Sequence, residues 1–139
     1  RIAASSARFV MAYANIGATA DGGSTYLLPR LVGGAKAMEI YLAGQPISAD
    51  SALAMGLISQ VCPKEELDQH ARETAARFAR GPTVAYGRAK ALFRRSWEAK
   101  LEEQLDAETE GISNIALTTD FQEGIRAFNE KRQPRFQGT

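Results

Sequence analysis

Apolar residues recur at helical spacing through most of the second half of the chain. In the segment that starts at Pro63, four of them follow one another at intervals of four, four and three residues, which is the spacing of one helix face. Similar spacing predicts three more helices, over 84–97, over 98–117 and from Thr119 onward, where Thr119 and Gln122 fit a capping box. The residues expected to point inward are Leu67, Ala71, Ala75 and Phe78 in the first helix, Val84, Leu92 and Phe93 in the second, Leu101, Leu105 and Ile112 in the third, and Phe121, Ile125 and Phe128 in the last.

Short amphipathic helices without a sheet of their own must bury their apolar faces elsewhere. We therefore expect these helices to pack on an upstream half of the protein or on a second copy of it. The chain starts at Arg1, without an initiator methionine and in what reads as the middle of an element, so we expect residues upstream. The tail from Gln133 onward is expected to be irregular.

The first half predicts short helices alternating with short strands. Residues 8–13 form a mostly apolar run that predicts a buried strand, and residues 57–62 predict a second one. Helices are predicted from Ser24 and from Ala35, and a third one after Ser48, which is a good N-cap residue. Glycines follow these helices where C-caps belong.

Composition and charge exclude several classes of protein. The 139 residues suffice for one domain or part of one. With 17 Lys and Arg against 16 Asp and Glu, the chain has no basic excess for nucleic acid or an anionic membrane surface. No apolar run approaches the roughly 20 residues of a membrane span. Cys62 is the only cysteine, so no internal disulfide can form, and we expect a cytoplasmic protein.

One stretch of the first half contains residues that could form a catalytic or ligand-binding site. Asp21 directly precedes Gly22 and Gly23, and Ser24 and Thr25 are natural N-caps for the apolar helix that follows. Glycines allow backbone angles closed to other residues and let a ligand approach the main chain closely. A lone carboxylate beside a helix start could move a proton. Alternatively, Asp21 caps the turn, as aspartates usually do.

The other reactive side chains form no catalytic set. His70 is the only histidine and has polar neighbours, so we expect it on the surface, and no Ser-His-Asp relay is available. His70 and Cys62 give no zinc pattern, and no metal site is expected. Cys62 precedes a proline and is expected to be a small buried hydrophobe. Near Phe128, the cations Lys131, Arg132 and Arg135 could hold an adenine and its phosphates, or could only complement the dipole of the helix end.

Nine short motifs then occur in a fixed order along the whole chain. In that order and spacing they resemble the second half of the enoyl-CoA hydratase/isomerase family, the crotonase superfamily. These motifs are RIAA (1–4), ARF (7–9), GGST (22–25), LPRLVG (28–33), AME (37–39), LAGQPISA (42–49), AMGLI (54–58), EGIRAF (123–128) and EKRQPRF (130–136).

The resemblance implies a fold and an assembly. The fold is the C-terminal portion of an α/β fold of the ClpP/crotonase type, mostly helical within this chain, with short strands near the start and around residues 57–62. Residues 1–62 would be the last part of a spiral of ββα units. Residues 63–139 would be a helical region that builds homo-trimers, often paired into hexamers.

The resemblance also implies acyl-CoA chemistry through an enolate. Coenzyme A is then part of the substrate, and no separate cofactor is expected. Two backbone N–H groups that hold the thioester oxygen would lie upstream of Arg1. Of the two glutamates that the family's hydratases use, one would also lie upstream and the other falls on Tyr13. A phenol with an ordinary pKa near 10 is a poor base at neutral pH, which disfavours hydration.

Asp21 matches family members that place an aspartate at this turn. They include the 2-(1,2-epoxy-1,2-dihydrophenyl)acetyl-CoA isomerases, the dienoyl-CoA isomerases and the 4-chlorobenzoyl-CoA dehalogenases. The first group, which belongs to aromatic degradation, is the most similar, through residues 9–12 and 27–30. In isomerases the aspartate moves a proton, whereas in dehalogenases it attacks the ring and a tryptophan occupies the position of Tyr13.

The leading hypothesis is therefore an acyl-CoA isomerase with Asp21 as its catalytic residue. A hydratase, a thioester hydrolase or a dehalogenase on the same scaffold is the second possibility, and a non-catalytic oligomerisation module is the third. Substrate or coenzyme A binding is assigned to Tyr13, Gly22, Gly23, Phe128 and Lys131, the last two because the family's final helix often contacts coenzyme A across a subunit interface.

Overall fold

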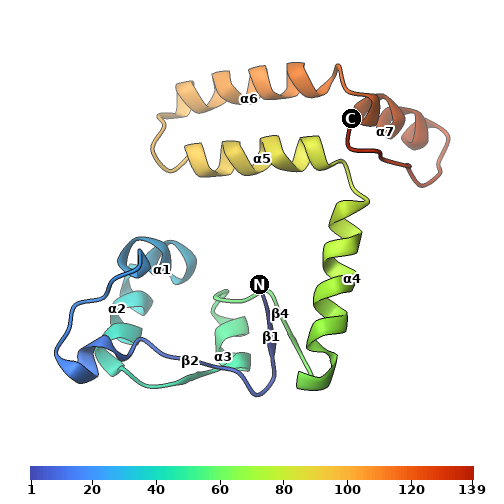
Figure 1. Ribbon diagram of the computed structural model, residues 1–139. Coiled ribbons are helices and arrows are strands. Elements are labelled where there is room, and N and C mark those ends of the chain that lie inside the picture. The colour runs from blue at the N-terminus through green and yellow to red at the C-terminus, as the bar shows by residue number, and fades with distance from the viewer. The chain divides into compact units, whose positions relative to one another are not determined.

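The computed structural model describes all residues from 1 to 139, and their contacts divide the chain into two compact units (Figure 1). The first unit comprises residues 1–72 and the second residues 73–139. The helix α4 (Leu67–Ala79) contains the boundary between them. None of the helices is long and apolar enough to cross a membrane.

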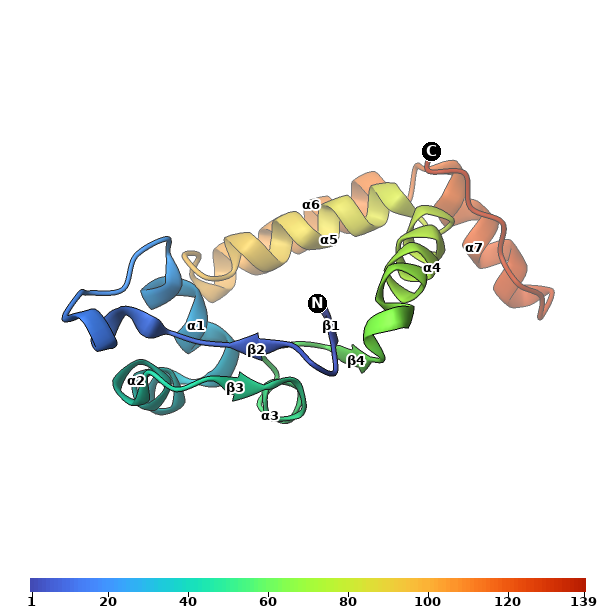
Figure 2. The same cartoon turned by 60° about the horizontal axis from the view of Figure 1, so that its bottom comes forward.

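The first unit combines two small sheets with short helices. Strand β1 (Ile2–Ala4) pairs in parallel with β4 (Gln60–Cys62), so that Ile2 lies opposite Gln60 and Ala4 opposite Cys62. Strand β2 (Arg8–Phe9) pairs in antiparallel orientation with β3 (Ile47–Ser48). Figure 2 shows β2 beside β3 and α3 directly after β3. The elements are β1 (Ile2–Ala4), β2 (Arg8–Phe9), the 3-10 helix η1 (Ala12–Ile16), α1 (Ser24–Val32), α2 (Gly34–Ala43), β3 (Ile47–Ser48), α3 (Ala49–Ala54), β4 (Gln60–Cys62) and the 3-10 helix η2 (Lys64–Glu66).

The core of the first unit is built mainly from alanines. Ala49 and Ala52 of α3 have no exposed surface, and they pack with Ala3 of β1 and with Ile58. Such small side chains let α3 lie close to the strands. Ser48 caps α3 as predicted, because its hydroxyl oxygen accepts a hydrogen bond of 3.1 Å from the Ser51 N–H.

The buried strand predicted over residues 8–13 is wrong beyond Phe9. Phe9 lies opposite Ile47, and the next residue of the chain would come opposite Pro46, which has no N–H to continue the ladder. The chain therefore leaves the sheet, half of the Val10 side chain is exposed, and η1 forms instead. The second predicted strand is shorter than expected, because the N–H groups of Leu57 and Ile58 turn back to the Ala52 carbonyl.

The second unit contains α5 (Thr83–Arg95), α6 (Leu101–Ile115), α7 (Thr119–Asn129) and an irregular tail, as predicted. Helices α5 and α6 lie side by side (Figure 1). The Gln104 side chain on α6 donates a hydrogen bond of 3.2 Å to the Leu92 carbonyl on α5. The predicted capping box at Thr119 is wrong by one residue, because Thr118 is the N-cap and its hydroxyl oxygen accepts from the Phe121 N–H.

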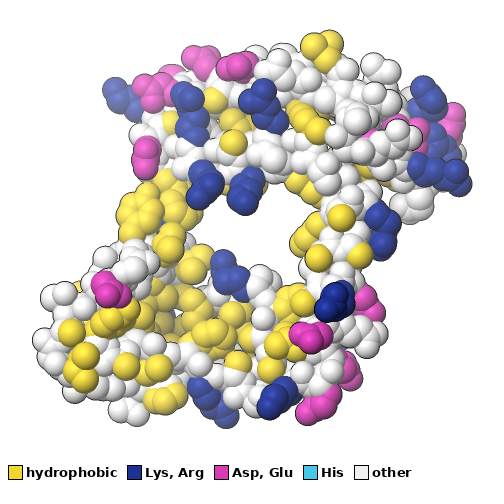
Figure 3. Space-filling model, in the orientation of Figure 1, with side chains coloured by type: hydrophobic (Ala, Val, Ile, Leu, Met, Phe, Trp, Pro, Cys, Tyr) yellow, Lys and Arg dark blue, Asp and Glu magenta, His cyan; other side chains and the backbone are white.

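Many apolar residues that were expected to point inward are exposed within this chain. Phe93 is 74% exposed, Leu101 68% and Phe128 82%, so helical periodicity marked an apolar face without showing what covers it. In the space-filling view, hydrophobic side chains also gather over one face of the first unit (Figure 3). These apolar faces are uncovered within this chain, and their packing on an upstream half or on a second copy stays a prediction.

Candidate active site

The 3-10 helix η1 carries Tyr13, and α2 holds this helix in place. The Asn15 side chain donates a hydrogen bond of 2.9 Å to the carbonyl of Gly44, the residue that ends α2. The Tyr41 hydroxyl of α2 donates one of 2.9 Å to the Ala18 carbonyl, just after η1. Gly17 ends η1 in the left-handed conformation and reverses the chain toward Asp21. The position of Tyr13 is therefore fixed from both sides of the segment.

The turn that carries Asp21 depends on two glycines. Gly22 and Gly23 have φ angles of +60° and +78°, which L side chains rarely adopt. Gly23 is the N-cap of α1, so the prediction that Ser24 or Thr25 has this role is wrong. The Ser24 N–H and hydroxyl donate instead to the main-chain carbonyl of Asp21, at 3.0 and 2.5 Å. The main chain of Asp21 thus closes the turn, and its side chain does not cap the helix.

The carboxylate of Asp21 is engaged by Tyr13. The Tyr13 hydroxyl donates a hydrogen bond of 2.6 Å to Oδ1 of Asp21, a length typical of a hydrogen bond to an ionised acceptor. This hydrogen bond raises the pKa of Tyr13 above its ordinary value of 10.0, and partial burial and the negative charge of Asp21 raise it further. At neutral pH Tyr13 is therefore a neutral donor. Oδ2 of the exposed Asp21 makes no hydrogen bond within the chain.

An apolar cavity of about 340 Å³ adjoins the two segments that carry this pair. Met11, two residues before Tyr13, and Ala20, directly before Asp21, both line it. The remaining wall comes from α1 and α2 and includes Leu28, Pro29, Met38 and Tyr41. The first unit thus places a carboxylate with one unpaired oxygen close in sequence to a mostly apolar hollow.

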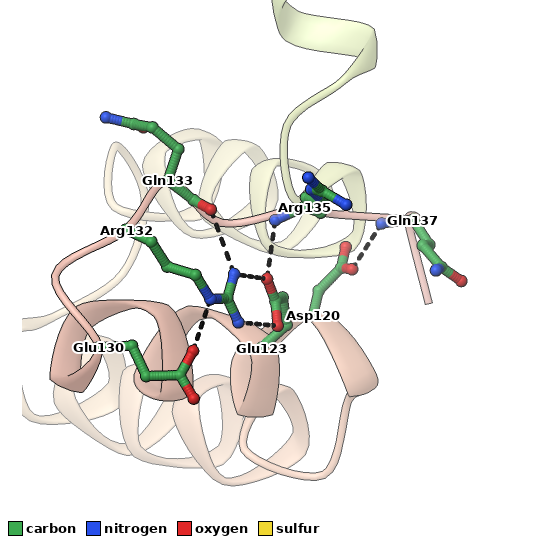
Figure 4. A network of polar contacts seen from close by, with 7 residues as sticks. All are labelled: Asp120, Glu123, Glu130, Arg132, Gln133, Arg135 and Gln137. Carbon is green, nitrogen blue, oxygen red and sulfur yellow. Dashed lines mark hydrogen bonds and ion pairs between the residues drawn. The ribbon is translucent and has the colours of Figure 1, made fainter.

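Of the basic cluster predicted near Phe128, Arg132 is paired with acidic side chains of the second unit (Figure 4). The Arg132 guanidinium contacts both oxygens of Glu123, at 2.6 and 2.9 Å, and Oε2 of Glu130 at 2.6 Å. The ion pair with Arg132 lowers the pKa of Glu123 to about 2. Most of the Arg132 N–H donors are therefore engaged within the chain, which disfavours the alternative in which Arg132 holds phosphates. Glu123 and Arg132 also line a larger hollow of about 740 Å³ beside α7, together with other residues of α7 and of the tail.

Phe128 and Lys131, the two predicted coenzyme A contacts, also lie in the second unit. Both are exposed, and Lys131 has a φ of +54° directly beyond the end of α7. The Lys131 ammonium makes no hydrogen bond or ion pair within the chain. Of the predicted site residues, the structure brings Tyr13, Asp21, Gly22 and Gly23 together in the first unit.

The prediction that His70 is a solvated surface residue holds only in part, because its side chain is 34% exposed but both ring nitrogens lie beside side-chain partners. Its Nδ1 lies 3.0 Å from the side-chain nitrogen of Gln60, and its Nε2 lies 3.3 Å from a carboxylate oxygen of Glu66. Helix α4 brings the ring beside β4, where Gln60 partners it. Cys62 is buried, as predicted, with its sulfur 3.8 Å from the Ala3 carbonyl oxygen. No group of three or more His, Cys, Asp or Glu residues could hold a metal ion.

Comparisons with known proteins identify the family to which this chain belongs. The model of the enoyl-CoA hydratase/isomerase family matches residues 1–139. The chain is therefore a member of the enoyl-CoA hydratase/isomerase family, and it has the crotonase fold. An enoyl-CoA hydratase structure from Bacillus anthracis superposes with a TM-score of 0.91 at 33% identity, over 100% of this chain and 54% of that one.

Two curated relatives differ in the activity that their names give. The chain is 41% identical to a "Probable enoyl-CoA hydratase" of Rhodobacter capsulatus, over 99% of this chain and 53% of the relative. It is 39% identical to the 1,2-epoxyphenylacetyl-CoA isomerase of Escherichia coli, over 99% of this chain and 52% of the relative. The chain spans about half the length of these curated relatives.

Proposed function

We propose that the protein containing this chain is an acyl-CoA isomerase in which Asp21 carries the proton. The observation that supports this most is the hydrogen bond from the Tyr13 hydroxyl to Asp21 Oδ1. Tyr13 stands where the family resemblance places the second glutamate of hydratases, and here it is a donor with a raised pKa. This part of the site therefore has one carboxylate, which suits the removal of a proton from one carbon and its return to another.

The rest of the proposed site follows from the surroundings of Asp21. Gly22 and Gly23 carry no side chains that would keep an acyl group from the main chain, and the adjoining cavity suits an apolar acyl part. Exposed Phe128 and Lys131 would contact coenzyme A across a subunit interface, and coenzyme A would be part of the substrate, so that no separate cofactor is needed. The thioester oxygen would be held by backbone donors outside this chain. A homo-trimer or hexamer in the cytoplasm would be the working form.

A hydratase is the second candidate, because a relative with 41% identity carries that name. Hydration requires a group that activates water, and Tyr13 offers only a protonated phenol there. The products separate the two reactions. The complete protein is incubated with 2-enoyl- and 3-enoyl-CoA thioesters, and the products are followed by ultraviolet absorbance and mass spectrometry. We expect the two isomers to interconvert without a gain of mass, whereas the addition of one water as the main reaction would contradict the proposal.

A further inference from the structure

We propose that Tyr13 is a positioning residue for the proposed isomerisation, whose hydroxyl binds Oδ1 of Asp21 so that Oδ2 is the oxygen that exchanges the proton. This inference rests on the proposed function of Asp21. It changes the role that family resemblance suggests for Tyr13, from contact with substrate or coenzyme A to orientation of the carboxylate.

The geometry shows why Asp21 needs such a partner. Ser24 holds its main chain through the carbonyl, but the side chain is exposed and has one hydrogen bond, which comes from Tyr13. Without it, the carboxylate would be free to rotate about its side-chain bonds and to present either oxygen in several directions. A misplacement of about 1 Å in a reacting group can cost roughly 100-fold in rate.

Tyr13 itself sits on a rigid support. Shortly after Tyr13 in the chain, Asn15 is hydrogen-bonded to Gly44 at the end of α2, and the Ala18 carbonyl accepts a hydrogen bond from Tyr41 of α2. These contacts hold the main chain that carries the Tyr13 side chain. Asp21 on the opposite side of the turn is the only charged group that acts appreciably on the Tyr13 hydroxyl. The pair therefore has a defined donor and a defined acceptor, and the second oxygen of the acceptor remains unpaired.

If Tyr13 must be protonated to bind Asp21, the enzyme activity should depend on pH. Because Asp21 raises the pKa of Tyr13 above 10.0, the donor persists through neutral pH and is lost only as the pH rises through that raised value. A phenolate beside the carboxylate could no longer donate and would repel it. We therefore expect wild-type activity to show an alkaline limb above about pH 10, which a variant without the hydroxyl would lack.

The test compares Tyr13→Phe with Tyr86→Phe in the complete protein. Tyr86 is a half-exposed tyrosine of α5 in the other unit and serves as the matched control. For Tyr13→Phe we expect kcat to fall roughly 10- to 100-fold with KM within about threefold, and the alkaline limb to disappear. Tyr86→Phe should retain the wild-type kcat and limb. A rise in KM alone would show that Tyr13 contacts substrate, and an unchanged kcat and limb would also overturn the inference.

A second measurement covers the case in which Tyr13→Phe fails to fold. The phenol groups of the wild type and of Asp21→Ala are titrated by ultraviolet absorbance while circular dichroism confirms that both remain folded. One tyrosine should ionise at lower pH in Asp21→Ala, because the group that raises its pKa is gone. Identical titrations would overturn the hydrogen bond and the inference with it.

The two proposals fail in different ways. If Asp21→Asn keeps full isomerase activity, the proposed function of Asp21 is wrong, and the inference about Tyr13 falls with it. If Asp21→Asn is inactive while Tyr13→Phe behaves as the wild type, Asp21 remains the proton carrier and only the positioning role of Tyr13 is wrong.

Discussion

Glu123 of α7 and Arg132 of the following tail form a two-point ion pair, with Oε1–Nη1 at 2.6 Å and Oε2–Nη2 at 2.9 Å. The main-chain N–H of Arg135 adds a third hydrogen bond of 2.9 Å to Oε1 of Glu123. One carboxylate thus joins α7 to two points of the irregular tail (Figure 4). This explains how a segment without regular structure has a defined path.

The ion pair predicts an acid-sensitive contribution to stability. The pKa of Glu123 falls from 4.5 to about 2 in the folded chain, so its stabilisation is complete above about pH 4.5 and is lost as the pH falls toward 2. We expect Glu123→Gln to lower the melting temperature at pH 6 and to melt like the wild type near pH 2. Thermal unfolding followed by circular dichroism tests this, with exposed Glu110→Gln of α6 as control. A deficit for Glu123→Gln that is the same at both pH values would contradict it.

Substitution of Asp120 should lower the free energy of unfolding without breaking a salt bridge. This residue is 3% exposed, and its two oxygens accept hydrogen bonds from the main-chain N–H groups of Gln137 and Gly138 at 2.7 and 2.8 Å. Asp120→Ala leaves these donors without an acceptor, so we expect a loss of about 2 kcal/mol in the free energy of unfolding. Urea unfolding measures this loss.

Hydrogen exchange at the tail provides the local readout for the same change. Exchange at Gln137 and Gly138 should become faster in Asp120→Ala, while Asp120→Asn, which keeps one acceptor oxygen, should lie between Asp120→Ala and the wild type. Unchanged protection of both amides would show that the tail is held by other contacts.

Two glycine-to-alanine substitutions should change the free energy of unfolding in opposite directions. Gly23 has a φ of +78°, and a Cβ there would meet only Leu27 at 3.9 Å, so its cost is conformational, about 1–2 kcal/mol. Gly87 lies inside α5, and a Cβ there would point into open space, so alanine should stabilise the helix by about 0.5–1 kcal/mol. Urea unfolding of Gly23→Ala and Gly87→Ala compares the two, and stabilisation by Gly23→Ala would contradict the turn geometry.

Sequence patterns predicted the helices well where local chemistry decides their ends. Ser48 caps α3, and Gly44 ends α2 in the left-handed conformation, as their residue types suggest. The strand over residues 8–13 was mispredicted because its length depends on its partner, where Pro46 precedes β3. Local patterns contain no such information about pairing.

The candidate site was only partly predictable for a related reason. Asp21 and the two glycines stand out in sequence because they adjoin one another. The hydrogen bond from Tyr13 joins residues eight positions apart across an irregular segment, where neither helical nor strand periodicity applies. The left-handed Gly17 between them is the one local signal that the chain reverses there. The pairing of Arg132 with Glu123 was missed because it depends on how the tail folds back on α7.

The central claim, that Asp21 carries the proton, is tested most directly by Asp21→Asn in the complete protein, with Asp50→Asn as control. Asn keeps the shape of the side chain but cannot accept a proton, and Asp50 is an exposed residue in the first turn of α3. The measurement is the rate of double-bond migration in an unsaturated acyl-CoA, followed by ultraviolet absorbance. We predict that kcat falls on the order of 10²–10⁴-fold in Asp21→Asn and stays within about twofold in Asp50→Asn. Wild-type activity in Asp21→Asn would contradict the account.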